Sequence, residues 1–243
     1  MAPSLRRIDF QERVLLVEGK DELNFYAGLA KSMQLCDKDE RCVHGNASPS
    51  AEDKEYEVRV CGKVEILSSG GIDNMVKDIE RLPNMTGFNS RIEVFGLAFD
   101  QDKHLKKDAV ASIQNALRKA NLPVPASSGE FTGAEAKPRV GFFVQAPDQQ
   151  FGSLEDLCLK AVESNPAMPC VKAYFLCLRN IQGGIAISDE TKMSKARMRV
   201  FLASKAEDPT LSIGVAAKKE SWLNFNHEVW KPVKQFLESL YRC

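Results

Sequence analysis

Acidic residues follow two apolar runs of this chain, and they are the first candidates for chemistry. Glu18 comes directly after the run 14–17, and Asp100 and Asp102 come at the end of the run 92–99. A short apolar run rich in β-branched residues predicts a strand that is buried on both faces. Open α/β sheets bind ligands at the carboxyl ends of such strands, so we expect the three acids to meet at one edge.

Carboxylates gathered at one sheet edge repel each other unless a cation lies between them. Oxygen ligands from Asp and Glu suit Mg²⁺ or Mn²⁺, and one or two such ions can activate a water and stabilise charge on a phosphate. The sequence therefore predicts a metal site for phosphate chemistry at Glu18, Asp100 and Asp102. Glu18 could instead serve as a general acid or base, because nearby charges move a carboxyl pKa toward the working pH. Both roles stay open at this point.

Glycines lie beside these acids. Gly19 follows Glu18 and permits a tight turn, and Gly70 and Gly71 separate the apolar segment 64–67 from a helical spacing that begins at residue 72. Glycines between a strand and a helix allow an anion to approach the backbone, so all three are candidate ligand-binding residues. A plain tight turn is the alternative. The segment lacks the lysine of a P-loop, which argues against an ATPase.

The elements that must position these residues alternate between strands and helices. Period-2 and fully apolar runs predict strands, and spacings near 3.6 predict helices. The predicted strands are 14–18, 56–61, 64–67, 91–99 and 139–145, of which 56–61 and 64–67 are either a hairpin or one strand with a break. The predicted helices are 22–33 after the cap Asp21, 72–82, 105–120, 154–162 after the cap Ser153, 171–181, 193–205 and 222–241 with a break near Pro232. This order predicts an α/β fold with a mainly parallel sheet and helices on both faces. The polar segment 36–54 is predicted to be a loop or a disordered insert.

Composition limits the partners and the compartment. Lys and Arg number 33, and Asp and Glu also number 33, so no overall basic field attracts nucleic acid. Nucleic-acid binding would need a local basic patch or a bridging metal. The 7 cysteines are odd in number and irregularly spaced, and no secretion signal is visible, which predicts reduced thiols and a cytoplasmic protein. Cys170 and Cys177 are expected to be buried thiols. The apolar stretches are too short to span a membrane.

The ordered set Glu18-Gly19, Gly70-Gly71 and Asp100-Gln101-Asp102 resembles the Toprim fold of topoisomerases, bacterial primases and OLD-type nucleases. The form Val-Glu-Gly-Lys-Asp looks most like a stand-alone, uncharacterised Toprim-like family that is related to OLD-type nucleases. The segments 139–157 and 193–195 also look like that family, so the resemblance covers most of the chain.

The resemblance implies particular roles. In Toprim nucleases the Glu and the Asp-x-Asp bind Mg²⁺, which carries over to Glu18, Asp100 and Asp102. In the OLD branch a further acid helps to hold metal and a lysine aids the transition state, and Glu155 and Lys195 occupy plausible equivalents. The implied fold is a Toprim-like core over residues 1–125, with the insert at 36–54, and a C-terminal α/β extension over 126–243 packed on it.

Each motif also has a plainer explanation. Glu18 can lie in a solvated turn, Asp100 and Asp102 can cap the next helix, and Glu155 can interact with a helix dipole. Lys195 can be a solvated helix residue. The basic set Lys192, Lys195, Arg197 and Arg199 could contact phosphates, or it could be an ordinary solvent-facing helix surface.

Two function classes follow from these residues. The first is a divalent-metal-dependent nuclease or related phosphotransferase that acts on DNA or RNA, with Mg²⁺ or Mn²⁺ as cofactor. The second is a non-catalytic Toprim module that binds nucleic acid, a nucleotide or a partner protein, and a homo-oligomer is compatible with either. A Rossmann-type nucleotide enzyme is a weaker third class, because the glycine turn lacks G-x-G-x-x-G.

Overall fold

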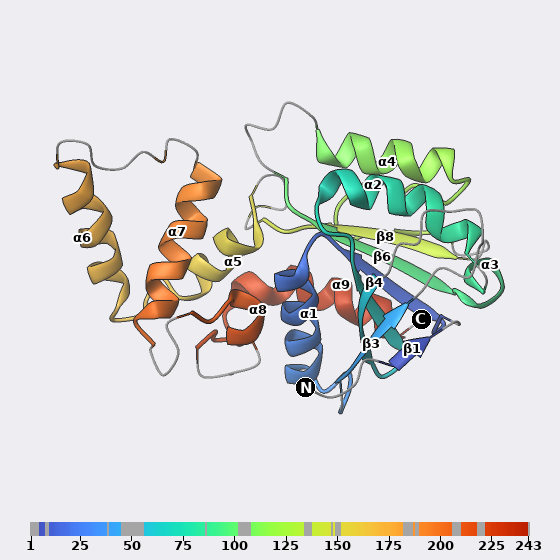
Figure 1. Cartoon of the computed structure of the whole chain (residues 1–243), viewed down its shortest axis with the longest axis horizontal. Helices are drawn as coiled ribbons and strands as arrows, with labels where there is room; N and C mark the ends of the chain where they lie inside the picture. Colours follow the sequence, from blue (N-terminus) through green and yellow to red (C-terminus); the bar gives the residue numbers. More distant parts are fainter. Residues whose placement is uncertain are drawn as a thin grey trace.

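The computed structural model is an α/β protein whose strands form one sheet with helices on both faces (Figure 1). It describes residues 5–7, 10–37, 39–44, 56–85, 87–101, 108–133, 138–146, 148, 152–181, 187, 190–205, 210–217 and 222–242. Asp102 and residues 45–54 of the predicted insert lie outside these ranges. In the described part of the chain, no helix is long and apolar enough to cross a lipid bilayer.

The sheet has the strand order β1-β3-β4-β5-β2-β6-β8-β7. Its strands are β1 (Leu5–Arg7), β2 (Arg13–Val17), β3 (Asp39–His44), β4 (Tyr56–Cys61), β5 (Val64–Ser68), β6 (Val94–Phe99), β7 (Phe131–Thr132) and β8 (Arg139–Val144). The central strands β5, β2, β6 and β8 are all parallel. The β4–β5 pair is the antiparallel hairpin around Gly62 that the alternating pattern allowed. The predicted α/β class with a mainly parallel sheet is therefore confirmed.

Helices follow the strands as the spacing predicts, with two corrections: the first helix begins at Lys20 with Gly19, not Asp21, as its N-cap, and the last predicted helix begins only at Glu228 and is not broken at Pro232. They are α1 (Lys20–Ser32), α2 (Ile72–Arg81), η1 (Leu82–Asn84), α3 (Phe88–Arg91), α4 (Ala109–Lys119), α5 (Leu154–Ala161), α6 (Met168–Arg179), α7 (Glu190–Ala203), α8 (Ile213–Ala216), η2 (Glu228–Trp230) and α9 (Lys231–Arg242). Helices α2 and α4 cover one face of the sheet, and α1 and α9 cover the other (Figure 1).

The alternation of side chains along each central strand builds a core on each face. In β2, Val14 and Leu16 join the core beneath α2 and α4, whereas Leu15 and Val17 join the core beneath α1 and α9. All four side chains are fully buried. A strand that is buried on both faces is a continuous apolar run, which is why β2 and β6 stand out in the sequence.

Helix α9 packs on one face of the sheet, against strands β2 and β6. A Cβ added to Gly96 of β6 would lie 3.2 Å from Leu240 Cδ1, so the helix approaches the strand at its glycine. The buried guanidinium of Arg13 donates from Nη1 to the carbonyl oxygens of Leu240 and Tyr241. The C-terminal carbonyls of α9 therefore find a cationic partner on β2.

Part of the predicted insert is a strand. Residues 39–44 form β3, which pairs in parallel with β1 and antiparallel with β4. The expectation of a loop over all of 36–54 is therefore wrong for this segment. Its sequence, DERCVH, is mostly polar and has no apolar run, which is why the pattern did not predict a strand there.

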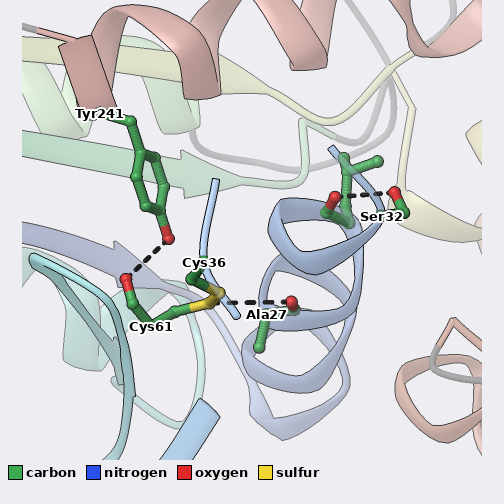
Figure 2. The surroundings of a disulfide bond; sticks show 6 residues. Ala27, Ser32, Cys36, Cys61 and Tyr241 are labelled. Atoms are coloured by element: carbon green, nitrogen blue, oxygen red, sulfur yellow. Dashed lines mark hydrogen bonds between the residues drawn. A yellow bond between two sulfur atoms is a disulfide. The ribbon is translucent and has the colours of Figure 1, made fainter. Parts of the chain in front are cut away.

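The cysteines differ from the expectation of free, buried thiols. Cys36 and Cys61 form a disulfide with a Cα–Cα distance of 5.5 Å (Figure 2). Next to it, the Tyr241 hydroxyl of α9 donates to the Cys61 carbonyl oxygen at 3.2 Å (Figure 2). Cys170 and Cys177 do share one helix, α6, but both are exposed. Helix α6 packs on α7 and leaves this side to solvent, so the predicted burial is wrong.

The predicted division at residue 125 stays a prediction. Strand β8 lies beyond that boundary, yet it pairs with β6 in the same sheet, with Arg139 opposite Val94. Helices α5 to α7 extend from the carboxyl end of β8 away from the sheet (Figure 1).

Candidate functional site

The carboxyl ends of β2 and β6 bring two predicted acids together. The strands are parallel neighbours with Val17 opposite Ala98, so Glu18 and Asp100 both follow at the same edge of the sheet. The Asp100 backbone N–H donates to Glu18 Oε2 at 3.2 Å. Residues 82 positions apart in sequence thus meet where the parallel register predicts.

Asp100 is held by two further hydrogen bonds. Its Oδ1 accepts from Gln145 Nε2 and from the backbone N–H of Leu154, both at 3.1 Å. Leu154 is the first residue of α5, so the carboxylate lies at the positive end of that helix dipole. The prediction that Asp100 caps the next helix in sequence is therefore wrong, because its carboxylate accepts from the first residue of α5 instead. Helix α4 is instead capped by Asp108.

A polar connection between α5 and α7 positions the second pair of predicted residues. Asp156 accepts from the Ser153 backbone and hydroxyl in a capping box, and its Oδ1 accepts from Ser194 Oγ of α7 at 2.6 Å. Glu155 and Lys195, the neighbours of Asp156 and Ser194, line the same pocket. Glu155 Oε2 is buried and has no hydrogen-bond partner among the described residues.

Glu22 is an acid of the site that sequence reasoning missed. It lies in the first turn of α1, one turn after Glu18, and its Oε2 would be 2.7 Å from a Cβ added to Gly19. The side chain therefore turns back toward the N-terminus of the helix. Burial raises the pKa of Glu22 to about 7, and the charges of Glu18 and Glu155 add to that effect. The i, i+4 spacing from Glu18 was the available signal.

These acids lie within one electrostatic field. Burial raises the pKa of Asp100 well above its ordinary value, and the charges of Glu22, Glu18 and Glu155 raise it further. Burial also raises the pKa of Glu155, whereas Lys195 opposes that rise. Burial alone would lower the pKa of Lys195, but the charges of the surrounding carboxylates have the larger combined effect and raise it. Glu18, Glu22, Asp100 and Glu155 together form a carboxylate cluster.

The predicted glycine turn supports Glu18 through its backbone. The N–H groups of Gly70 and Gly71 both donate to the Glu18 carbonyl oxygen at 2.8 Å. Both glycines have positive φ, +79° and +121°, so the turn needs residues without a side chain. These two donors are engaged within the chain, and anion binding at the turn stays a prediction. Gly19 is the N-cap of α1.

A buried thiol lies near the carboxylates. Cys158 of α5 is fully buried, and burial together with the charges of Glu155 and Glu22 raises its pKa well above the ordinary value. The side chain is therefore a neutral thiol, which excludes it as a thiolate nucleophile.

The donor chemistry of the cluster fits a hard divalent cation. Its members are carboxylate oxygens, including the unpartnered Glu155 Oε2, and the adjacent Gln145 Oε1 is also buried without a partner among the described side chains. The described Asp, Glu, His and Cys residues contain no group of three or more already arranged around one point to hold a metal. Asp102, the third predicted ligand, lies outside the described residues.

Comparison with known proteins identifies a family whose function is unknown. A family model described as "Protein of unknown function (DUF3226)" matches residues 12–242. That match covers every residue of the site. No curated protein matches the chain.

Proposed function

Because the chain belongs to the DUF3226 family, whose function is unknown, we propose one from the site: a divalent-metal-dependent nuclease that cleaves phosphodiesters of nucleic acid. The fold would be a Toprim-like sheet with the C-terminal helices packed beside its carboxyl edge. The observation that carries the proposal is the convergence of Glu18, Glu22, Asp100 and Glu155 with Lys195. Carboxyl groups whose pKa values are raised by burial and by one another favour a bound cation, which would replace their protons.

The proposed ligands are Glu18, Asp100, Asp102 and Glu155. Mg²⁺ or Mn²⁺ bound there would supply Lewis-acid stabilisation of the phosphate charge and a more acidic water. The hydrogen bonds from Gln145 and Leu154 fix Asp100 Oδ1, so they orient the carboxylate before any ligand arrives. Glycines 70 and 71 do the same for the backbone of Glu18.

Lys195 would stabilise negative charge on the phosphate, and Glu22 would transfer a proton. The surrounding carboxylates keep Lys195 protonated, so its ammonium can contact an oxygen of the phosphodiester in the transition state. Glu22 has a pKa of about 7, which suits a group that accepts or returns a proton near neutral pH. This gives Glu22 the acid–base role that the sequence left open for Glu18.

A non-catalytic module is the second candidate. The observation in its favour is that the described acids form no ready group of three around one point. The zero formal net charge also gives no general attraction to nucleic acid. Such a module would bind nucleic acid, a nucleotide or a protein through the same edge of the sheet without turnover.

A cleavage screen with matched variants separates these candidates. Purified protein is incubated with single- and double-stranded DNA and RNA in Mg²⁺, Mn²⁺ or EDTA. Metal-dependent product should appear with the native protein and fall at least about a hundredfold in Asp100→Asn and Glu18→Gln. Glu163→Gln is the control, because Glu163 is an exposed acid that pairs with Lys160 at 2.8 Å. Tight binding of a labelled oligonucleotide without any product would support the module and reject the nuclease.

A further inference from the structure

A pocket of about 330 Å³ opens beside the carboxylate cluster. It shares Glu155 and Lys195 with the site, and its remaining wall comes from α7, from the segment 210–213 and from Asp21 at the start of α1. The proposed nuclease function uses only the shared edge of this pocket. The rest of the pocket has no role in that function.

Part of the pocket wall is apolar. Met198 and Leu202 of α7 and Ile213 of α8 line it, and all three are buried, with exposed fractions of 0%, 1% and 5%. Leu211 adds a half-buried aliphatic side chain. A flat aromatic ring can lie against this part of the wall and remove its own apolar surface from water.

The rim of the pocket is cationic on one side. Lys195 and Arg199 are one turn apart on α7, so they lie on the same face of the helix, and both line the pocket. The other members of the basic set, Lys192 and Arg197, are not among its lining residues. The structure therefore divides the basic set into two cations at the pocket and two away from it. An Arg and a Lys on one edge suit a phosphate, with Arg able to donate two parallel hydrogen bonds.

The volume of the pocket suits a single nucleotide of a nucleic-acid strand. Ligand pockets of about 300–1,000 Å³ take small molecules, so 330 Å³ is at the lower end of that range. A base with its sugar fits such a space, whereas a duplex does not. The phosphate would then lie at the rim, between Arg199 and the carboxylate cluster that Glu155 belongs to.

We propose that this pocket binds the terminal nucleotide of a nucleic-acid strand and presents its phosphodiester to the carboxylate cluster. The base lies on Met198, Leu202 and Ile213, and the phosphate is held by Lys195 and Arg199. The polar groups of Asp21 and Ser212 accept or donate hydrogen bonds to the sugar and the base edge. The inference rests on the proposed function. It adds that the nuclease acts at the end of a nucleic-acid strand.

The first test is a binding measurement that needs no turnover. Isothermal titration of the native protein with dAMP in Mg²⁺ should show one saturable site, and adenosine and inorganic phosphate should each bind at least about tenfold more weakly. Arg199→Gln should weaken dAMP binding about tenfold or more, because a charge-assisted pair of hydrogen bonds is lost. Arg197→Gln removes the same charge from the same helix and should change binding less than about twofold.

Two results would overturn the inference at this stage. One is the absence of saturable dAMP binding in a folded native protein. The other is equal weakening in Arg199→Gln and Arg197→Gln, which would indicate a general charge effect. Leu211→Trp, which fills the pocket without removing a charge, should also abolish binding, and unchanged affinity in that variant would contradict the assignment. Circular dichroism and thermal unfolding confirm that each variant is folded.

The second test distinguishes a strand end from a free nucleotide. In Asp100→Asn, where cleavage should be absent, a linear single-stranded oligonucleotide should displace bound dAMP, and a covalently closed circle of the same sequence should not. In the native protein, the linear strand should be degraded and the circle should resist. Cleavage of the circle at a similar rate would refute the strand-end assignment while leaving the nuclease proposal intact. Binding of dAMP without displacement by the linear strand and without cleavage of any nucleic acid would reject both the strand end and the nuclease.

Discussion

The raised pKa of Glu22 predicts a pH dependence of stability that runs opposite to that of most surface carboxylates. The folded protein holds the Glu22 proton more tightly than the unfolded chain does, since the pKa rises from 4.5 to about 7. This contribution to stability is fully present below pH 4.5. It is lost as the pH rises through about 7, because the folded state must then keep a charged carboxylate among other acids.

The size of the effect follows from the two pKa values. A difference between 4.5 and about 7, at about 1.4 kcal/mol for each pH unit, gives about 3 kcal/mol. Because the side chain is half-buried, solvent screening makes this an upper bound. In urea unfolding in EDTA, the part of the free energy of unfolding that Glu22 contributes should therefore fall by up to about 3 kcal/mol between pH 5 and pH 8, in addition to the decrease that Asp100 and Glu155 cause.

Glu22→Gln is the variant that isolates this contribution. Its amide stays neutral, so the decrease between pH 5 and pH 8 should be smaller than in the native protein by up to about 3 kcal/mol, and the variant should be more stable than the native protein at pH 8. Addition of Mg²⁺ at pH 8 should stabilise the native protein, because a bound cation offsets the same repulsion. Glu238→Gln, on the exposed side of α9, should keep the native pH dependence. An equal decrease in the native protein and Glu22→Gln would refute the electrostatic account of the site.

Three further predictions concern how the site is held. Ser194→Ala removes the hydrogen bond to Asp156 that joins α7 to α5, so metal-dependent cleavage should fall several-fold in steady-state assays while the fold is retained; an unchanged rate would show that this bond does not position Lys195. Gly214→Ala should lower the free energy of unfolding by about 1–3 kcal/mol in urea, because the added Cβ would lie 2.6 Å from the Asp21 carbonyl oxygen where α8 crosses α1. Reduction of the disulfide of Figure 2 should lower that free energy by about 3 kcal/mol, since it closes a loop of 25 residues; a thermal midpoint that does not respond to reductant would contradict this.

The central part of the fold was predictable because it depends on local patterns. Strands β2 and β6 are apolar runs that end in acids, and a parallel register places their carboxyl ends at one edge. The meeting of Glu18 and Asp100 follows from those two facts alone. The pairing of Ser194 with Asp156 could not be predicted in this way, because it depends on how α7 packs on α5, which no spacing in the sequence reports.

The features that sequence reasoning missed depend on three-dimensional burial. Glu22 looks like an ordinary helix residue until α1 is docked on the sheet, and only then does desolvation change its pKa. Gln145 follows an apolar strand with no special spacing, yet its amide orients Asp100. Cys36 and Cys61 are 25 positions apart and come together only when β4 has paired beside α1. Tertiary contacts of this kind leave no periodic signal in one sequence.

The hydrogen bonds between Arg13 and the end of α9 have a consequence for the synthesis of the protein. The two partners are 227 positions apart, and α9 covers the sheet face that contains Leu15 and Val94. At a translation rate of about 5–20 residues per second, α9 is synthesised roughly 10–40 s after Arg13, so it can cover that face only after this delay. The apolar residues of that face therefore lack their C-terminal cover for most of the elongation of the chain.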